Sequence, residues 1–192
     1  MPKPNVREQI LSTGLALLHG RGFNATSVQD ITEAAGVPKG SFYNHFASKE
    51  ALGLEVMQRY TEQDAGLLAV LQEAGVAPLA RLKNYFRALM EVGTGMGPDC
   101  GCLLGNFSTE LSAHSPLIRQ RVNAAFDNWS ATLAEVVAQA QADGSLADDI
   151  PAADLAAFLV NAWEGAAVRY KASAQPLALN IFMDVVLRKI LR

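Results

Sequence analysis

The feature that most constrains this fold is a break within residues 26–49, where two short helical patterns meet at a Gly-Val-Pro sequence. Gly36 suits the left-handed conformation that ends a helix, and Pro38 suits the first turn of the next one. Thr26 stands three residues before Gln29, which is the spacing of a capping box, so we expect the first helix to begin there. Two short helices around a three-residue turn containing glycine form a helix-turn-helix motif.

The second of these helices, expected over about residues 38–46, has two different faces. Phe42 and Phe46 are four residues apart, so they lie on one side and are expected to anchor the helix to a small core. Gly40 costs a helix roughly 1 kcal/mol relative to alanine, which suggests that another molecule approaches the backbone there. A DNA phosphate or a base edge would do so. The alternative is an ordinary surface helix with a tolerated glycine.

The order of residues in this region has a known counterpart. The run D-I-T-E-A-A-G-V is followed by K-G-S-F-Y-N-H-F and then by S-K-E-A-L. These runs resemble the DNA-binding segment of the TetR family of bacterial transcriptional regulators, over about the first quarter of the chain. The resemblance implies an all-α fold of about nine helices. It also implies a helix-turn-helix DNA-binding domain over residues 1–47 and a ligand-binding and dimerisation domain over residues 48–192.

The same resemblance implies roles for individual residues. Residues of the recognition helix would read the duplex: Lys39, Gly40, Ser41, Tyr43, Asn44 and His45. Phosphate contacts are implied near Thr26, Ser27 and Lys49, and a base contact from Gln29. Family members often carry larger side chains where Ser41 and Asn44 stand, so the operator sequence stays open.

The charge distribution favours DNA binding only weakly. The chain has a net charge of -3, whereas residues 1–50 hold five Lys or Arg against four Asp or Glu. Affinity would therefore depend on a few placed cations and on dimerisation rather than on a broad positive surface.

Apolar periodicity predicts further helices over residues 5–20, 48–72, 78–92, 116–143, 151–172 and 176–191. The fifth of these is rich in alanine and glycine. Small side chains let helices approach closely, so we expect the last two helices of each subunit to form a four-helix homodimer interface. Ordinary packing within one chain is the alternative.

Residues 93–106 are the most ambiguous stretch. Their glycines would also suit a phosphate-binding loop, but Pro98 stands where such a loop needs its third glycine. A flexible connection between helices is therefore expected. The run G-C-L-L-G-N-F-S-T-E-L-S resembles a helix start in N-ethylmaleimide-responsive repressors of the same family, in which a cysteine senses electrophiles. Cys102 and Cys100 are both candidates for such a role here. A reactive thiol needs nearby cations or a helix N-terminus, and buried inert cysteine is the alternative.

A small-molecule effector would bind an apolar pocket that carries a few polar groups. The large side chains of the C-terminal region and Cys102 are the candidates to line it: Phe86, Met90, Cys102, Phe107, Phe126, Trp129, Trp163 and Tyr170. Glu164 and Arg169, within an otherwise apolar helix, are candidate polar groups, although a solvated helix face would also explain them.

The sequence therefore predicts a DNA-binding regulator, most simply a repressor that a small molecule releases from a double-stranded operator. A redox-sensing repressor acting through Cys102 or Cys100 is the alternative, and an activator would have the same sequence features. No metal site or cofactor is expected, because Cys100, Cys102 and His114 lack the usual spacing and a fourth ligand.

A helical enzyme would need a nucleophile and base that the three scattered histidines do not supply. An interaction protein would leave the Lys39–His45 face unexplained. The N-terminal sequence has no signal-peptide pattern and no apolar run is long enough to span a membrane, so a cytoplasmic location is expected.

Overall fold

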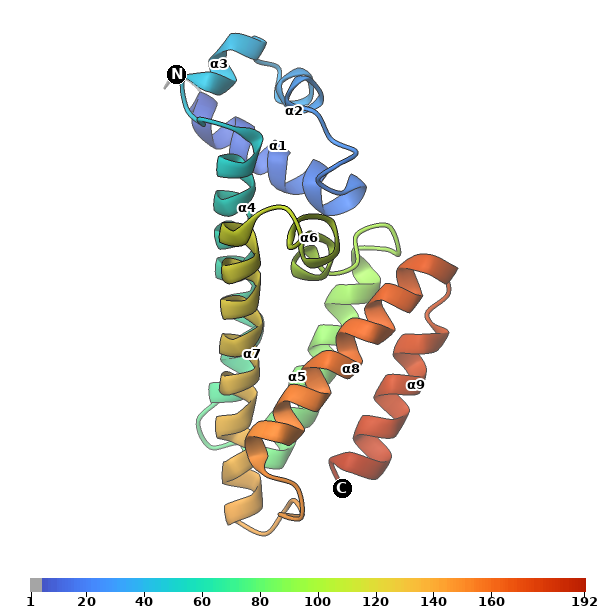
Figure 1. Cartoon of the computed structure of the whole chain (residues 1–192). Helices are drawn as coiled ribbons and strands as arrows, with labels where there is room; N and C mark the ends of the chain where they lie inside the picture. The colour runs from blue at the N-terminus through green and yellow to red at the C-terminus, as the bar shows by residue number, and fades with distance from the viewer. Residues whose placement is uncertain (1–4) are drawn as a thin grey trace. The chain divides into compact units, whose positions relative to one another are not determined.

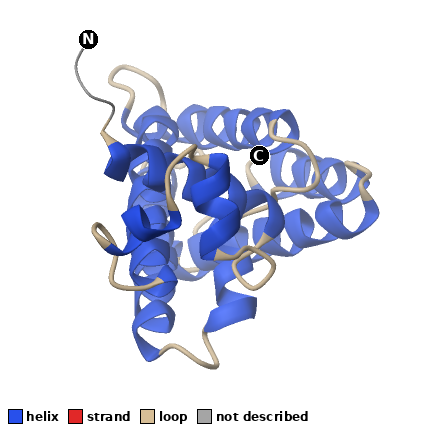
Figure 2. Ribbon diagram, turned by 90° about the horizontal axis from the view of Figure 1, so that it is seen from above, coloured by secondary structure: helices blue, strands red, loops and turns tan. Residues whose placement is uncertain are grey.

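A computed structural model describes residues 5–192, and within that range it contains helices and no strands (Figures 1 and 2). The helices are α1 (Val6–Arg21), α2 (Val28–Ala34), α3 (Lys39–Tyr43), α4 (Lys49–Leu68), α5 (Pro78–Gly95), α6 (Leu103–Leu111), α7 (Pro116–Ala142), α8 (Ala152–Ser173) and α9 (Leu177–Val185). A 3-10 turn follows α4 at Ala69–Gln72, and a π turn follows α9 at Val186–Ile190. The all-α class predicted from the sequence is confirmed.

The chain divides into two compact units. Unit 1 comprises Met1–Glu62 and Leu103–Val122, and unit 2 comprises Gln63–Cys102 and Asn123–Arg192. Helices α4 and α7 each contribute residues to both units. The units are thus assembled from different segments than the two domains expected over residues 1–47 and 48–192.

Unit 1 is a small helical core built on α1. Its fully buried apolar side chains come from six helices: Ile10, Leu18, Ile31, Phe42, Leu52, Val56, Leu103, Phe107 and Ile118. The rings of Phe23 and Phe107 meet edge to face with centroids 5.7 Å apart, so α6 closes the core beside the loop after α1. Two ion pairs, Arg7 with Glu55 and Arg59 with Glu8, join α1 to α4.

The beginning of α2 corrects one expectation. The N-cap is Ser27 and the capping box pairs it with Asp30, whereas the sequence suggested Thr26 and Gln29. The Thr26 hydroxyl instead donates to the carbonyl of Gly22 at 2.8 Å. Thr26 is therefore used to close the preceding loop, and the helix begins one residue later.

Several other boundaries also differ from expectation. Helix α3 ends at Tyr43 instead of continuing to residue 46. Helix α5 extends to Gly95, so the expected flexible connection over residues 93–106 is limited to residues 96–102. The predicted left-handed glycine is confirmed, since Gly36 has a φ of 67°.

Unit 2 has a larger apolar core, in which α9 packs against α8 and α5 (Figure 1). Its aromatic members interlock: Trp163 meets Phe182 edge to face, and Phe86 lies against the same Phe182 ring. Phe126 and Trp129 on α7 stack and pack against this core.

Within residues 5–192, no helix is both long and apolar enough to cross a membrane. The expectation that the N-terminal sequence is no signal peptide rests partly on residues 1–4, which lie outside the described part of the chain.

Candidate nucleic-acid interface and effector region

Helix α3 and the two residues that follow it present most of the predicted recognition residues on their outer side. Lys39, Gly40, Tyr43, Asn44 and His45 are exposed, and Tyr43 has 58% of its surface accessible. The sixth predicted residue, Ser41, is half-buried. The structure therefore brings the six together on a short segment that is open to an approaching molecule.

Two phenyl rings hold this short helix from behind. Phe42 is completely buried and Phe46 nearly so, and their ring centroids are 5.6 Å apart. The guanidinium of Arg7 lies over the Phe46 ring at 5.2 Å, which adds a cation–π contact from α1. A helix of five residues is too short to be stable alone, so these buried rings fix its position.

Gly40 leaves the outer face of α3 free of bulk. A Cβ atom added to Gly40 would meet no heavy atom within 4 Å, so packing inside the protein does not require glycine there. The backbone at this position is accessible to a partner.

The start of α2 is fixed by reciprocal hydrogen bonds. The backbone amide of Ser27 donates to the Asp30 carboxylate at 2.7 Å, and the Asp30 amide donates to the Ser27 hydroxyl at 3.1 Å. The hydrogen bond from the Ser27 side chain holds the pKa of Asp30 below its usual value. Gln29 is exposed, and its amide donates to Glu33 one turn later. Ser27 and Gln29 are thus both accessible at the start of α2.

Two of the predicted phosphate-contact residues face inward. Thr26 is buried. The Lys49 ammonium donates to the carbonyls of Phe23 and Thr26 at 2.9 and 2.8 Å, and it lies 4.1 Å from the centre of the Phe23 ring. Burial lowers the pKa of Lys49. Its charge therefore stabilises the loop between α1 and α2.

A residue that sequence reasoning missed holds the same loop. The Glu110 carboxylate on α6 accepts a hydrogen bond from the backbone amide of Asn24 at 2.7 Å. No local pattern could have revealed this contact, because 86 positions separate the two residues.

The candidate effector residues are divided between the units. Phe86, Trp163 and Tyr170 are buried in the core of unit 2, and Met90, Phe126 and Trp129 pack against that core. Phe107 belongs to unit 1, where it packs on Phe23. Cys102 is half-buried and is the last residue of its segment of unit 2.

The two polar candidates on α8 differ in their surroundings. Arg169 is exposed, as expected for a solvated face. Both carboxylate oxygens of Glu164 are buried and have no hydrogen-bond partner, so the solvated-face interpretation is wrong for this residue. The indole N–H of Trp129 on α7 is likewise buried without a partner.

Cys100 and Cys102 are half-buried, are not joined in a disulfide, and lie on the segment between α5 and α6. The carbonyl of Cys100 accepts a hydrogen bond from the Lys171 ammonium on α8 at 3.4 Å. Among residues 5–192, no three His, Cys, Asp or Glu side chains gather as metal ligands would.

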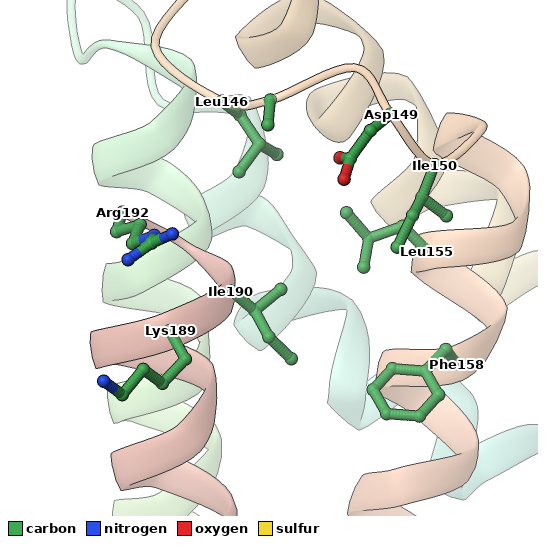
Figure 3. Close-up of a pocket in the computed structure, with 9 residues that line it drawn as sticks. Leu146, Asp149, Ile150, Leu155, Phe158, Lys189, Ile190 and Arg192 are labelled. Atoms are coloured by element: carbon green, nitrogen blue, oxygen red, sulfur yellow. The ribbon is translucent and has the colours of Figure 1, made fainter.

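A cavity of about 460 Å³ lies in unit 2, beside the last residues of the chain (Figure 3). Apolar side chains and three charged groups line it: Leu146, Ala147, Asp149, Ile150, Leu155, Phe158, Lys189, Ile190 and Arg192. None of the predicted effector residues is among them.

Helices α8 and α9 also carry apolar side chains on their outer surfaces. Phe158 and Val168 on α8 are exposed, as are Leu177, Ile181 and Val185 on α9. The three α9 residues are four apart, so they form one stripe. On α8, the exposed Gly165 lies between Phe158 and Val168 and leaves room for a close neighbour.

Comparison with known proteins identifies counterparts for both parts of the chain. A family model described as "Bacterial regulatory proteins, tetR family" matches residues 10–56. A second model, described as "Tetracyclin repressor-like, C-terminal domain", matches residues 78–186.

Individual relatives span nearly the whole length. The HTH-type transcriptional repressor DhaR of Mycobacterium sp. (strain GP1) is 38% identical, over 100% of this chain and 95% of DhaR. The transcriptional regulator AcuR of Cereibacter sphaeroides is 35% identical, over 91% of this chain and 80% of AcuR.

Solved structures share the fold. A crystal structure of the regulatory protein TetR from Rhodobacter sphaeroides is 32% identical and superposes with a TM-score of 0.89, covering 96% of this chain and 98% of that one. The reduced form of NemR from Escherichia coli is 28% identical with a TM-score of 0.86, covering 97% of each chain.

Proposed function

Because the chain belongs to the TetR family of bacterial transcriptional regulators, it is a DNA-binding regulatory protein, and we propose that it is a repressor which a small molecule releases from its operator. The observation that carries the proposal is the exposed polar face of α3, which buried Phe42 and Phe46 hold in place. Regulation of transcription, rather than catalysis, is the activity of this family.

Contacts to DNA divide into two kinds. Lys39, Tyr43, Asn44 and His45 offer hydrogen-bonding groups that reach base edges or phosphates in a major groove, and Gly40 lets the backbone approach. Ser41 and Gln29 are the remaining candidates for base contacts. Ser27 supports phosphate contact at the start of α2, whereas Thr26 and Lys49 act by holding the loop that leads into it.

The operator is read by a homodimer. The exposed apolar stripe on α9 and the neighbouring residues of α8 support an interface between two copies, because contiguous exposed apolar side chains favour association. Two α3 helices then occupy half-sites about 34 Å apart, or a multiple of that distance.

Release follows from a shift in population. An effector bound in unit 2 that prefers an arrangement of the dimer with the wrong α3 spacing draws molecules away from the operator-bound form. A cytoplasmic location is part of the proposal, because the operator is there.

Sensing of electrophiles or oxidants by Cys102 or Cys100 stays a prediction. The likeness to NemR favours it. The group that faces Cys102, however, is the Glu164 carboxylate, which is opposite in charge to the cations that activate a cysteine.

Binding of the full-length protein to DNA from beside its own gene, measured by fluorescence anisotropy, tests the proposal. Lys39→Ala and Tyr43→Ala should each weaken binding about tenfold or more, because one good base or phosphate contact contributes about 1–3 kcal/mol. Lys83→Ala, which removes the same charge from α5 in unit 2, is the matched control and should bind as the wild type does. Unchanged affinity in both α3 variants would contradict the assignment of this face.

A further inference from the structure

Glu164 lies on the buried side of α8. Val160 and Ala167, four residues before it and three after it, are buried, and so is the adjacent Trp163. Both carboxylate oxygens of Glu164 are inaccessible, and within residues 5–192 only the weakly donating Cys102 thiol faces them. Burying an ionisable group without a partner is costly, so such a group usually marks a place where a partner binds.

Among the described residues, no cation contributes to the surroundings of the carboxylate. The Cys102 thiol faces it, and a thiol is a weak hydrogen-bond donor. Burial raises the pKa of Glu164 to about 7, which the thiol offsets only in part, and no charged residue contributes to the shift. Arg81 on α5 is engaged by the Leu71 carbonyl and by Gln139, and the Lys171 ammonium on α8 donates to the Cys100 carbonyl.

The core to which α8 belongs is mostly aliphatic but contains several aromatic rings. Trp163 and Tyr170 lie on α8 itself, and Tyr85, Phe86 and Phe182 come from α5 and α9. Aromatic faces attract cations, and a carboxylate buried in a core that also contains such rings is a combination that recognises positively charged nitrogen. An anionic ligand would be repelled by the same carboxylate.

We propose that Glu164 is the anchor of the effector site, and that the effector presents a cationic nitrogen, such as a protonated amine or an amidine, to its two buried carboxylate oxygens. This inference rests on the proposed function, in which unit 2 binds an effector. The cation would replace the Cys102 thiol at the carboxylate. Since Cys102 immediately precedes α6, binding would displace the segment that leads into that helix.

Binding of matched probes to the full-length protein tests the chemistry. Benzylamine, phenethylamine and hexylamine are compared with benzyl alcohol, phenethyl alcohol, hexanol and benzoate by calorimetry and by tryptophan fluorescence. The amines should bind the wild type at least tenfold more tightly than the alcohols, and benzoate should bind most weakly. Failure of every amine to bind, or a preference for benzoate or the alcohols, would overturn the proposal.

Substitutions then test the residue. Glu164→Gln should remove the preference for amines and leave alcohol binding unchanged, whereas Asp154→Asn, which removes an exposed carboxylate from the same helix, should behave as the wild type. Glu164→Met, an apolar side chain of similar length, serves as a second variant should the first fold poorly. Amine binding that survives in a folded Glu164 variant would overturn the proposal.

Operator binding is measured separately, so that the two proposals can fail independently. If the protein binds no operator, the proposed repressor function fails, while amine binding through Glu164 still reports on the carboxylate. If amines bind through Glu164 but leave operator affinity unchanged, the assignment of Glu164 to the effector site is overturned.

Discussion

At the scale of single residues, the carboxyl group of Glu164 links stability to pH. Burial raises its pKa in the folded protein from 4.5 to about 7, so the folded state binds its proton more tightly than the unfolded chain does. Between these two values the folded state holds more protons, and the free energy of unfolding therefore falls as the pH rises from about 4.5 to about 7.

Glu164→Gln should abolish this contribution, which amounts to up to about 3 kcal/mol for a shift of this size. Urea denaturation of both proteins at pH 5 and pH 8 measures it. The free energy of unfolding of the Gln variant should exceed that of the wild type by more at pH 8 than at pH 5. An equal difference in this free energy at both pH values would mean that Glu164 is solvated.

Residue-level predictions from sequence succeeded where the relevant neighbours are local. Phe42 and Phe46 are four residues apart, and the Phe46 amide donates to the Phe42 carbonyl, so both rings point to the same side although α3 itself ends at Tyr43. Thr26 and Ser27 are both good capping residues, so the choice between them depends on the Gly22 carbonyl that Thr26 binds. The burial of Glu164 could not be predicted, because a glutamate on an apolar helix looks the same whether it faces water or the core.

At the scale of the element, α3 combines a rigid back with an accessible front. Gly40 weakens the helix, and no packing contact within residues 5–192 requires a glycine there. The residue is therefore expected to serve the bound DNA rather than the fold.

Gly40→Ala should raise the free energy of unfolding by up to about 1 kcal/mol, because alanine is the better helix former. The same substitution should lower operator affinity at least tenfold, because the added methyl group separates the backbone from the duplex. Thermal unfolding and fluorescence anisotropy measure the two effects. Gly66→Ala on α4 has equally open surroundings and should stabilise without changing affinity; a Gly40→Ala variant that binds DNA normally would argue against close approach.

The existence of most helices could be predicted from apolar periodicity and from helix-end signals. The exact residues at which the helices begin and end could not be predicted in this way. Ser115 caps α7 and Ser48 caps α4 as their side-chain chemistry suggests. Helix α5 runs on through Gly93, since that glycine packs under the Trp163 ring, a contact between residues 70 positions apart in the chain. Such long-range packing overrides the local tendency of glycine to end a helix.

At the scale of the whole molecule, the apolar stripe on α9 predicts the oligomeric state. Ile181→Arg should convert the proposed homodimer to monomers, because a desolvated charge in an apolar interface has no partner there. Sedimentation velocity measures the change. Operator affinity should fall with it, since each monomer contacts one half-site only.

Ala138→Arg places the same charge on an exposed position of α7 and should remain dimeric. A dimeric Ile181→Arg variant would show that the two copies meet elsewhere.

The chain passes between its two units inside α4, after Cys102 and inside α7, so neither unit is a contiguous stretch of sequence. A gene fragment that ends soon after α4 begins would lack Phe107 and Ile118, both fully buried parts of unit 1. Such a fragment would expose its hydrophobic interior and aggregate. Hybrid regulators that join unit 1 of one protein to unit 2 of another through a single fusion point should therefore fail. Successful chimaeras should need matched exchanges at all of these crossings.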